Sequence, residues 1–303
     1  MNAFTSALKR WVKKLASSLN KANTPSTNSF ALQSIKPRGK SQPETNKINK
    51  QDLKIFNDFQ TFCLIIGNAR SGSTILGSAI DAHPNAIVAN ETLASNNFWR
   101  GLNKESILQE VIENASVNHQ NSRPSENYHY QIGDAPATKK RVHVYGDKIW
   151  NPATLLLHGD YELIPRLSET LNAKIFLIAS IRNPFDTIAT MHRRSQAPIA
   201  DRIRWYFMHC ESISALEARS PDTGFMHCHH ELLIANPDEE LLRICEALNL
   251  STDKKHLESI SKFLFKTPSR SSSTIDWTVE DIENILTRMQ NFPYLAHYQN
   301  QTP

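Results

Sequence analysis

Short apolar runs alternate with amphipathic segments along most of the chain. Continuous or period-two apolar stretches predict strands, and a period near 3.6 residues predicts helices. The predicted strands are Phe62–Ile66, Arg141–Tyr145, Lys174–Ile181 and Gly224–His227. The predicted helices are Ser73–Ala82, Asn151–Leu157, Pro184–Arg194, 199–218 and Pro237–Leu248. Strand–helix alternation is typical of a mainly parallel sheet with helices on both faces, so we expect an α/β fold.

The N-terminal 20 residues form a separate unit. Apolar residues recur there at helical spacing, and lysines and an arginine fill the remaining faces. This pattern predicts a basic amphipathic helix, either docked on its own domain or anchored on a membrane surface. Residues 21–52 are polar and predict a flexible linker, so one domain should occupy residues 53–303. Within it, the polar and aperiodic residues 113–140 predict a mobile loop that contacts the substrate.

Composition narrows the class of protein. Of 303 residues, 40% are hydrophobic and 21% are charged, which suits one large folded core. The net charge of +4 fits a protein that handles anions. The basic N-terminus has no interleaved aromatic pattern, so we expect no nucleic-acid partner.

Cysteine usage and hydropathy bear on location. The four cysteines form no CxxC pair and lie in apolar surroundings, which favours a reducing compartment. No apolar run reaches the roughly 20 residues of a membrane span, and no signal-peptide core is evident. We therefore expect a cytoplasmic protein, with peripheral membrane contact through residues 1–20 as the alternative.

The first chemical signal is the run Gly67-Asn-Ala-Arg-Ser-Gly-Ser-Thr74, which follows an apolar strand and opens a helix. Glycines allow a tight turn whose N–H groups point inward, and the helix N-terminus adds partial positive charge. The loop is of P-loop type, GxxxxGK[ST], except that Ser73 replaces the lysine. It should bind a phosphate and is poorly built for nucleotide-triphosphate hydrolysis.

A second anion site is predicted at the end of the strand Lys174–Ile181. There Arg182 stands beside the start of a helix, and Pro184 suits that helix's first turn. A guanidinium fork matches phosphate geometry. The alternative is a strand-end salt bridge between Arg182 and Asp186.

These motifs together resemble the sulfotransferase family, closest to its tyrosylprotein and bacterial branch. The resembling segments are Arg70-Ser-Gly-Ser-Thr74, Asp81-Ala-His-Pro84, Arg182-Asn-Pro-Phe-Asp186 with Thr190 and Arg194, Trp205-Tyr206, His230-Glu-Leu-Leu233 with Asn236-Pro237, and loosely Ser269–Ser273 with Trp277. The resemblance implies transfer of a sulfuryl group from 3′-phosphoadenosine-5′-phosphosulfate (PAPS) to a hydroxyl acceptor, leaving the product PAP and requiring no metal.

The resemblance also implies which residues bind the donor. The 5′-phosphosulfate would lie on Gly67, Arg70, Ser71, Gly72, Ser73 and Thr74. The 3′-phosphate would lie on Arg182 and Thr190, with Arg194 as a further basic position. Ser269 and Arg270 would belong to the nucleotide loop.

Three residues are the candidates for catalysis. Asn90-Glu91-Thr92 resembles a family segment that supplies the general base, so Glu91 is the candidate base. Cytosolic small-molecule members use a histidine instead, and Trp150 occupies the equivalent place here. Lys148 and Arg70 resemble the residues that stabilise charge on the leaving oxygen.

Other interpretations remain open on sequence. A nucleoside-triphosphate kinase or NTPase, and a nucleotide-binding protein of the same fold without activity, are the two rival functions. His227 and His229 would share one face of a strand, but no second ligand pair follows, so we expect no metal site. The acceptor and the oligomeric state are undetermined; a carbohydrate, lipid, peptide or small metabolite would serve as acceptor.

Overall fold

The computed structural model describes residues 59–92, 102–120, 139, 141–149, 151–220, 224–262, 264, 267 and 269–303. The predicted N-terminal helix and linker, with Trp150, lie outside these residues. So do residues 121–138 and 140 of the predicted loop. The domain boundaries thus stay a prediction.

The core of the described chain is a five-stranded sheet in the order β2-β3-β1-β4-β5, in which every pairing is parallel. The strands are β1 (Thr61–Gly67), β2 (Ala86–Asn90), β3 (Val144–Lys148), β4 (Lys174–Ile181) and β5 (Phe225–His229). Parallel strands need helical crossovers that cover both faces of the sheet. The predicted α/β class is confirmed.

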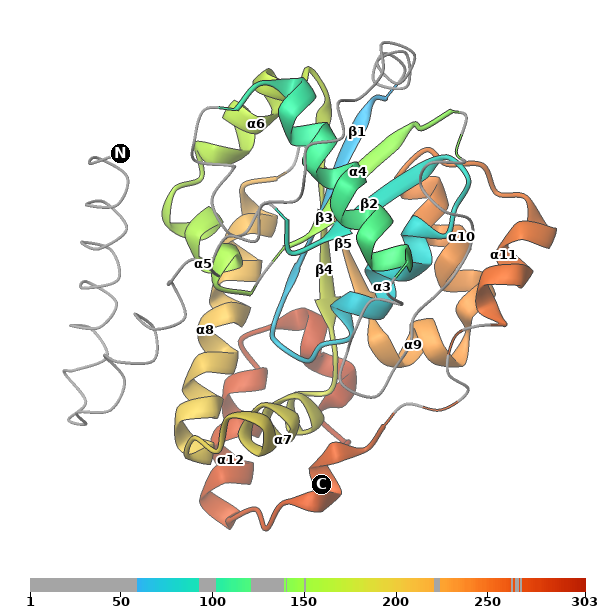
Figure 1. Cartoon of the computed structure of the whole chain (residues 1–303). Helices are drawn as coiled ribbons and strands as arrows, with labels where there is room; N and C mark the ends of the chain where they lie inside the picture. Colours follow the sequence, from blue (N-terminus) through green and yellow to red (C-terminus); the bar gives the residue numbers. More distant parts are fainter. Residues whose placement is uncertain are drawn as a thin grey trace.

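Successive side chains of β1 enter opposite layers of the core. Phe62, Leu64 and Ile66 pack in one apolar cluster, and Cys63 and Ile65 pack in the other. On the first face lie α4 (Lys104–Gln120), α5 (Asn151–Gly159), α6 (Leu163–Leu171), α8 (Ile199–Ala218) and α12 (Val279–Met289). On the second lie α3 (Ser73–Asp81), α10 (Pro237–Ala247) and α11 (Lys254–Ser261). The result is a three-layer arrangement (Figure 1).

The remaining elements gather near the carboxyl ends of the strands, towards which the arrows point in Figure 1. They are α7 (Pro184–Ser195), α9 (His230–Ala235), and the short 3₁₀ helices η3 (Ser271–Thr274) and η4 (Pro293–Tyr298). In an open parallel sheet, ligands bind outside this edge. The fold therefore predicts that the ligand-binding site lies at this edge of the sheet.

The predicted strand at Arg141–Tyr145 begins too early. The observed strand, β3, runs from Val144 to Lys148 and pairs residue by residue with β1. Gly146 obscured its extent, because glycine usually weakens a strand. Here a Cβ at this position would come within 2.6 Å of the Cys63 carbonyl oxygen, so only glycine lets the two strands approach.

The prediction of a loop over residues 113–140 is wrong for residues 113–120, which are the last turns of α4. This helix buries only a narrow stripe, formed by Ile107, Leu108, Val111 and Ala115. Apart from Ile112 and Val117, its remaining surface is mostly polar, which masked the helical period. No helix in the described residues is both long and apolar enough to cross a membrane.

Candidate functional site

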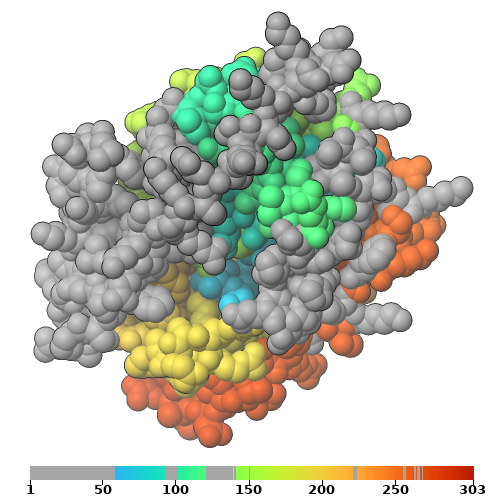
Figure 2. All heavy atoms as spheres, in the orientation of Figure 1, coloured from blue at the N-terminus to red at the C-terminus, as the bar shows by residue number. Residues whose placement is uncertain are grey.

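The loop between β1 and α3 depends on two glycines with positive φ. Gly67 has φ +147° and Gly72 has φ +88°. Gly72 is the N-cap of α3 and has no side chain to accept from the free N–H groups of the first turn. A helix leaves these donors without partners in its own backbone, which suits an anion. Figure 2 shows this stretch (blue) between α4 (green) and the α7–α8 region (yellow).

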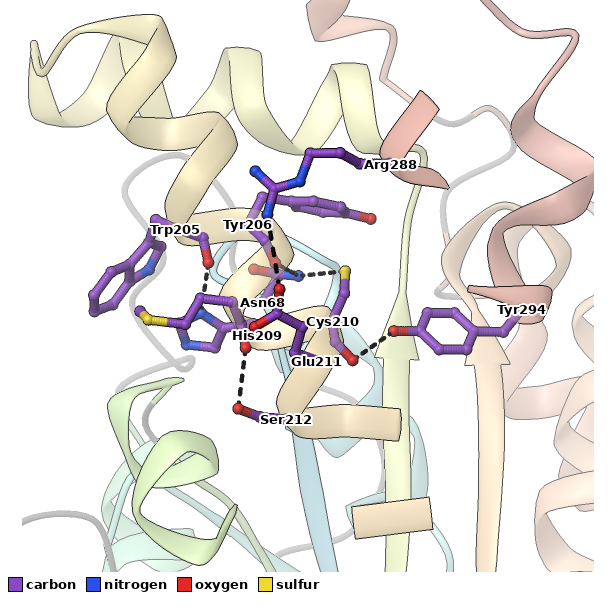
Figure 3. Close-up of polar contacts among 10 residues, drawn as sticks. Asn68, Trp205, Tyr206, His209, Cys210, Glu211, Ser212, Arg288 and Tyr294 are labelled. Carbon is purple, nitrogen blue, oxygen red and sulfur yellow. Dashed lines mark hydrogen bonds and ion pairs between the residues drawn. The ribbon is translucent and has the colours of Figure 1, made fainter. Parts of the chain in front are cut away.

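Hydrogen bonds with α8, α5 and β4 hold this loop in place. Asn68 is buried, and its side-chain amide donates to the Tyr206 carbonyl oxygen at 3.2 Å and to Cys210 Sγ at 3.7 Å (Figure 3). The Gly67 N–H donates to Thr154 Oγ1 at 3.4 Å. Ser180 Oγ donates to the Ser71 carbonyl oxygen at 3.0 Å. Three surrounding elements thus fix the loop before any ligand arrives.

Arg182 joins three of the predicted motifs. It is 7% exposed, and its guanidinium donates to the carbonyl oxygens of Arg70 at 3.1 Å and Ser269 at 2.6 Å. Its Nε is buried without a hydrogen-bond partner in the described part of the chain. The alternative pairing with Asp186 is not what the geometry shows, because the Asp186 carboxylate accepts the Ser272 N–H at 2.7 Å.

The start of α7 is built as the sequence predicts. The Asn183 side chain accepts the N–H groups of Phe185 and Asp186, and Pro184 fills the first turn. Thr190 is buried, and its hydroxyl donates to the Asp186 carbonyl oxygen at 2.7 Å. This hydroxyl would have to turn to donate to a phosphate. No hydrogen bond joins Thr190 to Arg182 among the described residues.

One predicted basic residue, Arg194, affects the pKa of another, Arg70. Partial burial and then the charge of Arg194 lower the pKa of the Arg70 guanidinium, while Glu91 acts in the opposite direction. Arg70 also adopts a left-handed φ of +68°. The loop Gly67–Thr74 (called the donor loop below, after its predicted role), the end of α7 and the candidate base therefore share one electrostatic environment.

The candidate base and one charge-stabilising residue meet at adjacent strand ends. Glu91 follows β2, Lys148 ends β3, and Lys148 Nζ lies 2.5 Å from Glu91 Oε1. Glu91 has φ +62°, and its N–H donates to the Lys148 carbonyl oxygen at 2.8 Å. The Lys148 side chain is 6% exposed and that of Glu91 38%, so the carboxylate stays accessible.

The predicted nucleotide loop packs on α7. Its Ser269 and Arg270 side chains are exposed. The neighbouring Ser272 is bound from both sides, by Asp186 and by Trp277, whose Nε1 donates to the Ser272 carbonyl oxygen at 2.9 Å. The Ser269 carbonyl oxygen accepts from the Arg182 guanidinium, so this segment lies beside the second predicted anion site.

Sequence reasoning gave no role to two residues that support the site. A Cβ on Gly72 would come within 2.2 Å of His230 Nδ1, so this imidazole packs directly against the loop. Burial and the charge of Arg182 lower the pKa of His230 to about 3. Glu231 accepts the Asn183 N–H at 3.0 Å. Only the match of His230–Leu233 to a family segment could have drawn attention to them.

The two histidines of β5 that the sequence analysis considered as metal ligands pack against other rings. His227 stacks on Tyr294 with ring centroids 4.7 Å apart, and His229 packs against His297 at 4.4 Å. Across the described ranges, no three His, Cys, Asp or Glu side chains are grouped to hold a metal ion.

Comparison with known proteins gives a family. A model of the sulfotransferase family matches residues 63–254, which is more than half of the chain. No curated protein sequence matches.

Several solved structures are distantly similar. A Mycobacterium avium sulfotransferase is 14% identical with TM-score 0.45, covering 82% of this chain and 79% of its own. A mouse sulfotransferase complexed with PAP is 13% identical with TM-score 0.43, covering 83% and 93%. The sulfotransferase domain of a Synechococcus olefin synthase is 16% identical with TM-score 0.43, covering 73% and 82%. The family assignment rests on the family model.

Proposed function

This chain belongs to the sulfotransferase family, and on that premise we propose how its residues bind PAPS and transfer the sulfuryl group to a hydroxyl acceptor. The enzyme class follows from the family: a sulfotransferase, not a nucleoside-triphosphate kinase. The absence of the loop lysine, with Ser73 in its place, agrees with this class. The residue assignments below are the proposal.

The donor fits the two anion sites. The N–H groups that open α3, with Gly67, Arg70, Ser71, Gly72, Ser73 and Thr74, would bind the 5′-phosphosulfate. Arg182, with Thr190, Arg194, Ser269 and Arg270 around it, would bind the 3′-phosphate. Two buried polar atoms without partners among the described residues, Ser71 Oγ and Arg182 Nε, suit such a polyanion.

Transfer requires a base and charge stabilisation. The acceptor oxygen forms the new bond to sulfur, the bond from sulfur to the bridging oxygen breaks, and PAP leaves. Glu91 would take the proton from the acceptor hydroxyl. Lys148 and Arg70 would stabilise the negative charge that develops on the bridging oxygen. The chemistry needs no metal, since the donor carries its own activation.

The observation that carries this assignment is the position of Arg182. Its guanidinium contacts the main chain of both the donor loop and the C-terminal loop. A ligand with two phosphate groups would bind on either side of such a bridge. The nature of the acceptor, a cytoplasmic location and membrane contact through residues 1–20 stay predictions.

Calorimetric titration with PAP in chelator tests the proposal. We expect tight binding by the wild type, weakened at least about tenfold in Arg182→Ala, which corresponds to about 1.4 kcal/mol. Arg182→Lys keeps the charge and loses the fork, so it should fall between the two. Arg166→Ala, an exposed arginine on α6, is the matched control. Mg²⁺-ATP should not compete, and a folded wild type that fails to bind PAP would overturn the proposal.

A further inference from the structure

We propose that Tyr294 and Tyr298, near the end of the chain, are positioning residues for the two phosphate sites. The inference rests on the proposed function. Both tyrosines lie in η4, beyond residues 63–254 that match the family model. Both are buried at the carboxyl edge of the sheet, and each starts a separate chain of hydrogen bonds to one anion-binding loop.

The first chain leads from Tyr294 to the donor loop. The Tyr294 hydroxyl donates to the Cys210 carbonyl oxygen in α8 at 3.0 Å (Figure 3). The thiol of that same Cys210 accepts from the Asn68 amide, which also donates to the Tyr206 carbonyl oxygen in the same helix. Tyr294 thus fixes the helical turn on which the base of the loop is fastened. Loss of its hydroxyl would let that turn shift under Asn68.

The second chain leads from Tyr298 to the other phosphate site. The Tyr298 hydroxyl donates to Glu231 Oε2. The second oxygen of this carboxylate, Oε1, accepts the Asn183 N–H at 3.0 Å. Asn183 directly follows Arg182, and its own amide reaches Gln301 at 3.4 Å. One oxygen of the Glu231 carboxylate therefore accepts from Tyr298 in η4, and the other accepts from the N–H of the residue that follows Arg182.

The chemistry of both tyrosines suits a fixed donor. Burial raises the pKa of each hydroxyl well above its ordinary value, and Cys210 for Tyr294 and Glu231 for Tyr298 add to the effect. Each hydroxyl therefore stays protonated and keeps donating over the working pH range. A carboxylate such as Glu231 loses its aim when one of its two partners is removed.

Titration with two ligands distinguishes the roles of the two series of hydrogen bonds. PAP carries both phosphates, whereas adenosine 5′-phosphate lacks the 3′ group. Titration of Tyr298→Phe should show PAP binding weakened about three- to tenfold, with adenosine 5′-phosphate changed less than about twofold. Tyr294→Phe should weaken both ligands by similar factors. Phenylalanine keeps the buried ring in each case, so packing is largely preserved.

The control is Tyr161→Phe, which removes another tyrosine hydroxyl bonded to a carbonyl oxygen, that of Arg219 at the far end of α8. It should leave both affinities unchanged. Thermal unfolding is measured in parallel, and titrations are done where every variant is folded. A second variant, Glu231→Gln, should reproduce the selective loss of PAP binding.

The outcomes are separable. PAP affinities within twofold of wild type in both tyrosine variants would overturn the inference and leave the proposed function intact. An equal loss of both ligands in Tyr298→Phe would overturn its assignment to the 3′-phosphate site. A wild type that binds no PAP would overturn the proposed function first, and this inference with it.

Discussion

Glu91 Oε1 lies 2.5 Å from Lys148 Nζ, across the ends of two neighbouring parallel strands. The register pairs Asn90 with Lys148, and the left-handed φ of Glu91 turns the next residue back towards the lysine. Because the Lys148 side chain is almost fully buried and that of Glu91 is not, the Glu91 carboxylate is accessible from solvent while the Lys148 ammonium is not. The pair thus places the proposed base and a proposed charge-stabilising group within one contact.

Glu91→Gln should abolish proton removal and leave donor binding intact. A glutamine occupies the same volume but takes up no proton, and general base catalysis contributes about 10²–10⁴-fold. We expect the rate of PAP release from PAPS to decrease by a factor in that range. The rate is measured with whichever hydroxyl compound gives turnover in an acceptor screen. The PAP dissociation constant, measured by calorimetry, should stay within about twofold. An unchanged rate would remove Glu91 from the mechanism.

Lys148→Met should lower turnover for a different reason. Methionine fills the buried space but offers no charge to the leaving oxygen, and loss of one such donor costs about 2.7–4 kcal/mol of transition-state stabilisation. Single-turnover rates at saturating PAPS measure this directly. If Lys148 served only to hold Glu91, adding Lys148→Met to Glu91→Gln would slow the reaction no further, and the double variant would match Glu91→Gln alone.

Gly72→Ala should disable the donor loop. Its φ of +88° is strained for alanine, and the new Cβ would come within 2.2 Å of His230 Nδ1. Strain of this kind costs about 1–3 kcal/mol, so both the free energy of unfolding and PAP affinity should fall. Gly159→Ala, at the exposed end of α5, is the control and should be neutral or slightly stabilising. Equal behaviour of the two variants in denaturant titration would contradict the prediction.

Asp186→Ala should release the C-terminal nucleotide loop from α7. The substitution leaves the Ser272 N–H without the acceptor that now lies 2.7 Å away. Losing a buried hydrogen-bond partner costs about 1–3 kcal/mol. Unfolding by urea should show that loss, and PAP should bind more weakly because Ser269 contacts Arg182. Asp186→Asn keeps an acceptor oxygen and should recover most of the stability and most of the PAP affinity. If it does not, the negative charge of Asp186 matters more than its hydrogen bond to Ser272.

Stability should fall in mild acid, with His209 as one cause. Burial lowers the pKa of this imidazole to about 4 from an ordinary 6.5. The unfolded chain then binds a proton at higher pH than the folded chain does. The stabilisation is complete above pH 6.5 and is lost as pH falls towards 4, by about 1.4 kcal/mol per pH unit for one proton.

His209→Gln tests that origin. The two ring nitrogens lie 3.0 Å from the Trp205 carbonyl oxygen and 3.2 Å from that of Asn151, and a glutamine amide offers comparable donors without titrating. The free energy of unfolding, measured by urea titration across this pH window, should depend less steeply on pH in the variant. An unchanged slope would assign the acid sensitivity to other groups.

Local signals explain why much of the fold could be predicted. The strand Lys174–Ile181 and the helix over 199–218 are observed at the predicted boundaries. The strand is a continuous apolar run that is buried at every residue but the first, and the helix is the long segment that follows Pro198. The position of β3 and the helical nature of 113–120 could not be predicted in this way. The first depends on the space that Gly146 leaves beside Cys63, and the second on a narrow apolar stripe.

The candidate site also has a part that could be predicted and a part that could not. The donor loop and the segment Arg182–Asp186 are contiguous motifs, so the sequence indicates them directly. The contact of Arg182 with Ser269 joins residues far apart in the chain, and so does that of Tyr298 with Glu231. Such pairs follow from how α7, α9 and η4 meet in space, and no local pattern encodes that meeting.

The contacts of η4 also set a time for the site to be completed during synthesis. A ribosome releases β1, β4 and the donor loop long before residues 294–301 emerge. Until then Glu231 lacks its partner Tyr298, and Asn183 lacks its partner Gln301. A nascent chain interrupted before those residues would hold every motif of the proposed donor site and still lack these hydrogen bonds, so newly made molecules should gain full nucleotide affinity only after Tyr298 and Gln301 have left the ribosome.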